Sequence, residues 1–357
     1  MQICFFEDQL LHRFHPLTLT RPVDDLRLGI TTIREKWEQE LDATRSARLL
    51  RNQFQGLFEQ GSISDSEPCT WINARYLPSQ TLLGQIQELD VGSSLQNAEG
   101  VIAAKVDGPT STKWHQENKP QFKSLMVLET DEFNPLQHLW DLFQLNREQI
   151  AADIKRFDKK SSGNARISTE AVLEQEDQIY IEEGAVIEPG AILMADTGPI
   201  FIGRNATVSA GAIIKGPVAI GEDSVVKMGA RIYDATTIGP VCKAGGEISN
   251  SIFHSYSNKG HEGYVGNSLI GQWCNIGAGT NTSNLKNNYS TIRLTEWKSR
   301  QEEETGQQFI GTIMGDHSKT AINVQLNTGT VCGVSCNIFT SDFPRNSSPP
   351  SPGWAPT

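Results

Sequence analysis

Residues 202–238 read IGRNATVSAGAIIKGPVAIGEDSVVKMGARIYDATTI, and an aliphatic residue returns at every sixth position of this stretch. A period of six fits neither an α-helix nor an alternating β-strand. It is typical of a β-solenoid built from hexapeptides, in which each short side of a triangular coil turns one aliphatic side chain inward. The positions of the series are Ile202, Val208, Ile214, Ile220, Val226, Ile232 and Ile238.

The same spacing extends to both sides of this stretch, so we expect a parallel β-helix over residues 167–340. One slip of nine residues, at 193–202, contains Thr197-Gly198-Pro199, which suits a bulged turn. The period loosens between residues 238 and 276, and residues 285–309 interrupt it as an insertion loop. Insertions into a solenoid project from one face and often build its site. The outer members of the series are Ile181, Ile187, Leu193, Met314, Thr320, Leu326, Cys332 and Ile338.

The first 150 residues follow a different pattern, in which short apolar runs alternate with helical ones. Strands are predicted within residues 3–6, 68–78 and 100–106. Helices are predicted within 28–41, where Ile30, Ile33, Trp37 and Leu41 share one side, and within 136–157. This alternation predicts an α/β, Rossmann-like domain over residues 1–150. A linker over 151–166 then leads to the solenoid, and a tail rich in Pro and Ser covers 341–357.

Composition restricts the possible partners of this chain. Lys and Arg number 31 against 42 Asp and Glu, a formal net charge of −11, so we expect no nucleic-acid partner. The opening MQICFFEDQL does not resemble a signal peptide, and no apolar run approaches the roughly 18 residues of a membrane span. Six cysteines lie without a C-x-x-C pair. We therefore expect a cytoplasmic protein with reduced thiols, no membrane contact and no metal site.

The stretch NKGHEGYVGNSLIGQWCNIGAGTNTSNL, residues 258–285, contains the patterns G-H-x-x-Y-x-G-x-x-x-I-G and N-I-G-A-G-T-x-T-x-N. Together with the period of six, these patterns resemble the left-handed β-helix acetyltransferase half of the bifunctional UDP-N-acetylglucosamine pyrophosphorylase/glucosamine-1-phosphate N-acetyltransferases. Residues 311–333 look like the coenzyme A side of the archaeal members. The opening HPLTLTRPVDDLRLGITTIREKW looks like the start of a sugar nucleotidyltransferase. The chain thus resembles two-domain nucleotidyltransferase/acyltransferase proteins, and a left-handed β-helix is the fold that this resemblance implies.

The resemblance assigns His261 as the general base of acetyl transfer. Histidine suits this task because imidazole changes charge near neutral pH. It also implies that the Ala278 N–H polarises the thioester carbonyl of acetyl-CoA, the expected co-substrate. The alternatives are that His261 is a structural histidine and that Ala278 only forms part of a tight glycine-rich corner.

Further positions match substrate contacts of the family, and each could instead be a solvated surface residue. Three residues of the family's pattern are replaced in this chain, by Ser249, Leu285 and Ser290. These replacements put the identity of the acceptor in doubt more than the acyl chemistry. The implied sugar-phosphate contacts are Arg231, Tyr264, Asn275, Asn284, Lys286 and Arg293, and the implied coenzyme A contacts besides Ala278 are His317 and Lys319.

The first domain departs further from its resemblance. A nucleotidyltransferase carries a glycine-rich loop after its first strand, whereas here no glycine precedes Gly29. The strand that should end in a Mg²⁺ carboxylate reads Ile72-Asn73-Ala74-Arg75, and a guanidinium repels Mg²⁺. We expect Mg²⁺ only if this domain is active, in which case Arg13, Arg21 and Asp24 are the nucleotide-binding candidates.

Three functions stay open. The leading one is an acetyl-CoA-dependent N-acetyltransferase acting on an amino-sugar 1-phosphate in nucleotide-sugar biosynthesis, assembled as a homotrimer like related acyltransferases. The second makes the sugar-1-phosphate nucleotidyltransferase the main activity. The third is a non-catalytic trimeric scaffold that binds sugar nucleotides. A carbonic anhydrase is excluded because His254, His261 and His317 lack the close histidine pair of that zinc site.

Overall fold

The computed structural model describes residues 1–157, 163–340, 342 and 347–348. The middle of the expected linker and most of the expected tail lie outside these residues. The chain divides into two compact units. The first comprises Met1–Phe14, Arg21–Leu26 and Thr31–Gln137, and the second comprises His15–Thr20, Arg27–Ile30 and the chain from His138 onward.

The first unit is built on a six-stranded sheet in the order β2-β1-β3-β5-β4-β6. β1 pairs in parallel with β2 and β3, β4 pairs in parallel with β6, and β5 runs antiparallel to both of its neighbours. This mixed sheet with helices is the α/β domain that the alternating pattern predicts. Its elements are β1 (Gln2–Phe6), α1 (Ile33–Glu40), β2 (Arg45–Arg48), β3 (Cys69–Asn73), α2 (Gln80–Glu88), β4 (Ser93–Asn97), β5 (Gly100–Val106), α3 (Gly108–Glu117) and β6 (Met126–Glu129).

Helix α1 shows why the sequence folds as it does in this unit. The Thr32 side chain accepts a hydrogen bond from the Glu35 N–H, and the Glu35 carboxylate accepts one from the Thr32 N–H. This capping box starts the helix at Ile33, later than the sequence pattern places it. Ile33 and Trp37 are fully buried, as their spacing predicts.

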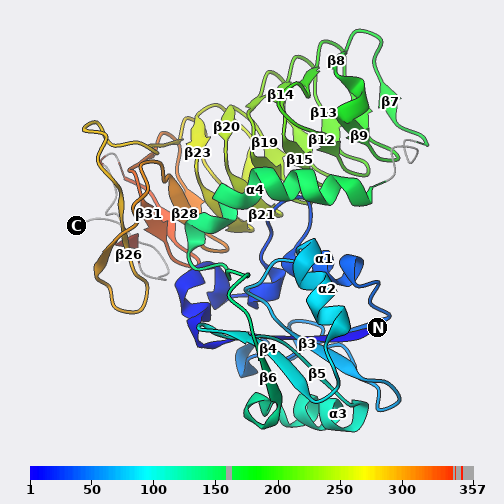
Figure 1. Ribbon diagram of the computed structural model, residues 1–357. Coiled ribbons are helices and arrows are strands. Elements are labelled where there is room, and N and C mark those ends of the chain that lie inside the picture. Colours follow the sequence, from blue (N-terminus) through cyan, green and yellow to red (C-terminus); the bar gives the residue numbers. More distant parts are fainter. Residues whose placement is uncertain (158–162, 341, 343–346, 349–357) are drawn as a thin grey trace. The chain divides into compact units, whose positions relative to one another are not determined.

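The second unit is a left-handed parallel β-helix with three faces (Figure 1). The period of six predicts its coils, and the resemblance implies their handedness. We call its faces the first, second and third face. The first holds β7 (Arg166–Ile167), β10 (Val186–Ile187), β13 (Thr207–Val208), β16 (Val225–Val226), β19 (Lys243–Ala244), β22 (Asn258–Lys259), β29 (Lys319–Thr320) and β32 (Asn337–Ile338). The second holds β8 (Val172–Glu174), β11 (Ile192–Met194), β14 (Ile213–Lys215), β17 (Arg231–Ile232), β20 (Glu247–Ser249) and β23 (Tyr264–Gly266), and the pair β25 (Asn281–Thr282) and β30 (Gln325–Leu326) follows. The third holds β9 (Ile179–Ile181), β12 (Ile200–Ile202), β15 (Val218–Ile220), β18 (Thr236–Ile238), β21 (Ile252–Ser255), β24 (Leu269–Gln272), β28 (Thr312–Met314), β31 (Thr330–Cys332) and β33 (Ser347–Ser348).

The coils of the β-helix differ in length, and the difference falls around the motif. Ile220 pairs with Ile238, which is 18 positions later. Ile238 then pairs with Phe253 after 15 positions. The partner of Ile270 is Met314, 44 positions later, because this coil carries the insertion. Leu285 and Phe309 form an antiparallel bridge at the base of the insertion, which contains the hairpin of β26 (Arg293–Thr295) and β27 (Glu302–Glu304).

Helix α4 (Leu139–Asp153) packs along the third face and contacts β15, β18 and β21. The sequence pattern places most of this helix in the first domain, whereas in the structure it lies within the second unit. Asn146 explains the attachment, because its fully buried amide donates to the Ala235 carbonyl oxygen at 2.8 Å and accepts from the Gly29 N–H at 2.6 Å. A buried amide satisfied in this way fixes the helix on the sheet.

Candidate functional site

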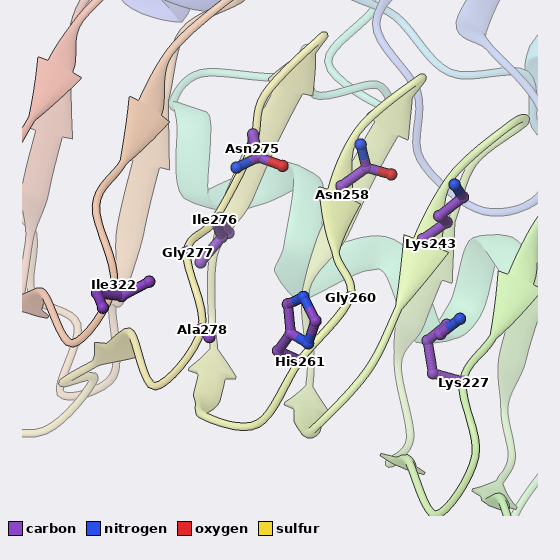
Figure 2. Close-up of a pocket in the computed structure, with 10 residues that line it drawn as sticks. All are labelled: Lys227, Lys243, Asn258, Gly260, His261, Asn275, Ile276, Gly277, Ala278 and Ile322. Carbon is purple, nitrogen blue, oxygen red and sulfur yellow. The ribbon is translucent and has the colours of Figure 1, made fainter.

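A pocket of about 450 Å³ opens at the corner between β22 and β23, on the β-helix itself (Figure 2). This corner carries His261, whose side chain is exposed. Two lysines lie to one side of the imidazole, and uncharged residues lie to the other. The lining residues are Lys227, Lys243, Asn258, Gly260, His261, Asn275, Ile276, Gly277, Ala278 and Ile322.

Strand register explains why residues far apart in sequence meet here. On the first face, Lys243 pairs with Asn258, which bridges to Asn275. Each pairing advances by one coil, about 4.8 Å. On the second face, Arg231 and Tyr264 lie on either side of β20 in the same register. The corner that bears the imidazole joins the two faces, so residues of both faces flank it.

The Ala278 N–H is available to a ligand. The two neighbouring N–H groups are engaged: Gly277 donates to the Thr320 hydroxyl oxygen at 2.9 Å, and Gly279 donates to the Glu262 carbonyl oxygen at 2.9 Å. Among the described residues, none accepts a hydrogen bond from Ala278. An amide that lines a pocket with its donor free can polarise a carbonyl oxygen. The bond from Gly279 also ties this corner to the one that carries His261, a coil away.

Beneath the corner lies Lys259, a feature that the sequence analysis did not single out. It occupies an inward position in the register of Val226 and Ala244, where the other coils place apolar residues. Its side chain is fully buried, and the ammonium donates to the His261 carbonyl oxygen at 2.7 Å. Burial lowers the pKa of Lys259 to about 8, against the opposing effect of the Glu262 carboxylate.

Two of the expected sugar contacts meet on the second face. The Asn284 amide donates to the Tyr264 hydroxyl oxygen at 3.1 Å and to the Asn267 side-chain oxygen at 2.7 Å. Burial raises the pKa of the Tyr264 phenol, so it stays neutral and can donate. Arg231 lies near this pair, but its guanidinium already faces Glu247 at 3.6 Å and Glu262 at 3.4 Å.

Neither Arg231 nor Tyr264 nor Asn284 lines the pocket, and the remaining expected contacts besides Asn275 also lie outside its lining. Lys286 donates to the Thr291 carbonyl oxygen within the insertion, and Arg293 pairs with Glu304 in the hairpin at 2.5 Å. Lys319 bridges to Asn275, and its ammonium lies 3.3 Å from the His317 carbonyl oxygen. The His317 ring is exposed and stacks in parallel with that of Trp273, with centroids 6.3 Å apart.

The structure adds pocket residues that the sequence analysis missed. Lys227 and Lys243 come from coils before the motif, Asn258 opens the stretch that carries it, and Ile322 comes from the coil after the insertion. A strict period of 18 aligns Val225 with Lys243 but not Lys243 with Asn258, because that coil is shortened. These residues can be identified from the register of the coils once the length of the short coil is known.

The nucleotide-binding candidates of the first unit take part in internal pairs. The Arg13 guanidinium donates to the Gln137 side chain. Arg21 is 1% exposed and pairs with Asp25 at 3.0 Å. Asp24 is 1% exposed, faces Arg48 at 3.2 Å, and has its pKa raised to about 7 by burial.

The side chains at the strand ends of the first unit do not suit Mg²⁺. Asp8 follows β1, but both of its oxygens accept hydrogen bonds from Arg75 at 2.7–3.0 Å, and one also accepts from Asn73 at 2.9 Å. A carboxylate held by a guanidinium is a poor ligand for a divalent cation. Within the described ranges, no cluster of three or more His, Cys, Asp or Glu side chains is arranged to hold a metal ion. Across the same residues, no helix combines the length and apolar character that crossing a bilayer requires.

Comparisons with known proteins find one family model and several relatives that resemble parts of this chain. Residues 3–162 match the sugar nucleotidyl transferase family. The bifunctional protein GlmU of Methanocaldococcus jannaschii is 36% identical over 95 residues, which are 27% of this chain and 22% of that protein. A bifunctional sugar-1-phosphate nucleotidylyltransferase/acetyltransferase of Sulfurisphaera tokodaii is 30% identical over 93 residues, 26% of this chain and 23% of that protein. The chain thus spans less than a quarter of the length of these curated relatives.

A solved structure, the acetyltransferase domain of PglB from Neisseria gonorrhoeae FA1090, covers 99% of this chain and 98% of its own. It is 9% identical, with a TM-score of 0.23. The same domain in complex with acetyl coenzyme A covers 54% of this chain and 90% of its own, at 12% identity and a TM-score of 0.18.

Proposed function

We propose that the second unit of this transferase is an acetyl-CoA-dependent N-acetyltransferase, because the chain is similar over part of its length to bifunctional nucleotidyltransferase/acetyltransferase proteins. The acceptor is an amino-sugar 1-phosphate of the glucosamine 1-phosphate kind. One observation carries the proposal: the pocket combines the His261 imidazole with a free Ala278 N–H on the next coil. These are the two groups that acyl transfer to an amine requires.

In the proposed reaction, the amino nitrogen of the acceptor attacks the thioester carbonyl carbon. The His261 imidazole takes a proton from this amino group as it attacks. The Ala278 N–H donates to the carbonyl oxygen, on which negative charge develops. The C–N bond forms, the C–S bond breaks, and the proton held by the imidazole passes to the departing thiolate. The products are the N-acetylated sugar phosphate and free coenzyme A. Tyr264 and Asn284 supply hydrogen bonds to the sugar hydroxyls.

The test is release of thiol from acetyl-CoA by the full chain, with and without glucosamine 1-phosphate. We expect release to depend on the sugar phosphate, and His261→Ala to lower kcat by about 100-fold or more. His12→Ala is the matched control, because His12 lies in the first unit. A His261→Ala rate within about threefold of the parent would remove the assignment of the base.

A nucleotidyltransferase in the first unit is the second candidate, favoured by the match of residues 3–162. It predicts release of pyrophosphate from a nucleoside triphosphate and a sugar 1-phosphate, dependent on Mg²⁺ and indifferent to His261→Ala. The Arg75–Asp8 pair argues for a unit that has lost this reaction. If acetyl-CoA is neither consumed nor bound and no pyrophosphate appears, a non-catalytic scaffold remains.

We propose that the active assembly is a homotrimer. Support comes from exposed apolar side chains beside the pocket: Met228, which follows Lys227, is 75% exposed, and Ile322, which lines the pocket, is 68% exposed. Side chains of this kind beside a site suit contact with another chain. Sedimentation should give a mass about three times 39.4 kDa. A fully active monomer would contradict the assembly.

A further inference from the structure

The pocket at His261 is chemically asymmetric. Lys227 and Lys243 lie on the side of earlier coils, whereas Ala278 and Ile322 lie on the side of later coils (Figure 2). The imidazole stands between a cationic end and an uncharged end. An acyl transferase holds two different substrates on either side of its base, so the two ends suit different ligands.

Among the residues that line the pocket, Lys227 and Lys243 are lysines without a carboxylate partner. Both ammonium groups are exposed, and neither forms an ion pair or a side-chain hydrogen bond with any described residue. By contrast, the charge of Arg231 is shared between Glu247 and Glu262. A phosphate that enters the site would have to displace these carboxylates to reach Arg231. At the lysines it meets two uncompensated charges and displaces only water.

The coil geometry sets the lysines at a suitable spacing. Lys243 lies on β19, and the Lys227 N–H donates to the Ala244 carbonyl oxygen at 2.7 Å, so the two residues come from adjacent coils of the first face. Lys243 pairs with Val225, so Lys227 lies one coil and two positions away from it. Two long, flexible side chains can span this diagonal of about 8 Å and converge on one phosphoryl group.

We propose that Lys227 and Lys243 form an anion subsite for the phosphate of the acceptor, with His261 between this subsite and the acyl donor. The inference rests on the proposed acetyltransferase function and names the residues that select a phosphorylated acceptor. The donor's thioester arm then lies at the uncharged end, against Ala278 and Ile322. Arg231 serves to hold Glu262, and through it the corner, rather than to bind phosphate.

The test compares Lys227→Met/Lys243→Met with the parent chain, using glucosamine 1-phosphate, glucosamine and acetyl-CoA. We expect KM for glucosamine 1-phosphate to rise by about 10- to 100-fold, with a smaller effect on kcat, because two charge-assisted hydrogen bonds to phosphate are lost. The preference for the phosphorylated over the phosphate-free acceptor should fall by the same factor. Lys227→Arg/Lys243→Arg should restore most of it. Lys215→Met is the control, because Lys215 faces Asp196 at 3.7 Å on another face.

Other outcomes overturn the assignment. A rise in KM for acetyl-CoA with an unchanged acceptor preference would move the lysines to the donor's phosphates, and unchanged constants for both substrates would remove the subsite. Calorimetric titration of the full chain with glucosamine 1-phosphate separates this inference from the function it rests on. Binding that weakens about 10-fold in the double Met variant supports the subsite even without turnover, whereas binding that the variant leaves intact refutes it.

Discussion

The buried ammonium of Lys259 donates a hydrogen bond to the main-chain carbonyl oxygen of His261, 2.7 Å away. The lysine stands in a column of the β-helix that is otherwise apolar around it, since its neighbours in register are Ala244 and Ile276. Burying a charge in an apolar interior opposes folding unless a partner compensates it. Here the partner belongs to the proposed catalytic residue, so the lysine holds in place the corner that carries the imidazole.

This arrangement predicts a specific pH dependence of stability. Burial lowers the pKa of Lys259 to about 8, whereas in the unfolded chain it returns to about 10.4. Between these values the unfolded chain binds the additional proton, so the contribution of Lys259 to the free energy of unfolding rises with pH. Lys259→Met lacks this contribution. The difference in urea midpoint, parent minus variant, should increase from pH 8 to pH 10. Parallel curves for the two proteins would contradict this prediction. The control is Lys215→Met, which removes a partly exposed lysine and should run parallel to the parent.

The Arg75–Asp8 pair predicts a large effect on the first unit. Arg75 is 1% exposed and donates to both oxygens of Asp8 and to the Leu136 carbonyl oxygen at 2.8 Å. Arg75→Met leaves this carboxylate unpaired, which should lower the free energy of unfolding by about 3 to 5 kcal/mol. Urea unfolding followed by circular dichroism measures the change. Arg45→Met, on the exposed edge of β2, should stay within about 0.5 kcal/mol of the parent.

A second variant tests the cause of that effect. In Arg75→Met/Asp8→Asn the partner is neutral, so part of the lost stability should return. If the double variant is no more stable than the single one, the unpaired carboxylate is not the source of the loss.

Local spacing in the sequence predicts most of the β-helix. Between Ile202 and Ile238, the aliphatic residue at every sixth position is buried inside one side of a coil, so the period of six predicts the fold directly. The period does not predict that Lys259 is an interior residue, because lysine side chains lie at the surface in most proteins. The shortened coil between Ile238 and Phe253 shifts every later residue relative to the earlier faces, so the alignment of Lys243 with Asn258 emerges only from strand pairing.

Spacing in the sequence also predicts part of the candidate site. The motif placed His261 and Ala278 seventeen residues apart, which is one coil, and the structure brings both into one pocket. Lys286 and Arg293 belong to the insertion, whose hairpin pairs its own side chains, and no spacing rule predicts that. The pairing of Arg75 with Asp8 joins residues 67 positions apart, and it depends on β1 and β3 being neighbours.

Gly266 controls the position of the Tyr264 hydroxyl. A Cβ at this glycine would lie 2.1 Å from that hydroxyl oxygen, so Gly266→Ala must displace the phenol ring. The displacement breaks the hydrogen bond from Asn284, at 3.1 Å, and we expect KM for the acceptor to rise about 3- to 10-fold. KM for acetyl-CoA should stay within about twofold. Gly84→Ala is the control, since a Cβ there meets nothing within 4 Å, and equal shifts for both substrates would argue against a role of Tyr264 in acceptor binding.

Removal of the Ala278 N–H tests the carbonyl-polarising role most directly. Ala278→Pro deletes this donor, which no described residue accepts from, and leaves the bonds of Gly277 and Gly279 available. We expect kcat to fall by about 100- to 1,000-fold, because the N–H acts on charge that develops only during transfer. Ala278→Ser keeps the N–H and should stay within about threefold of the parent. Circular dichroism and Tm establish that the Pro variant is folded, and a folded variant that keeps the parental kcat would exclude this amide from the reaction.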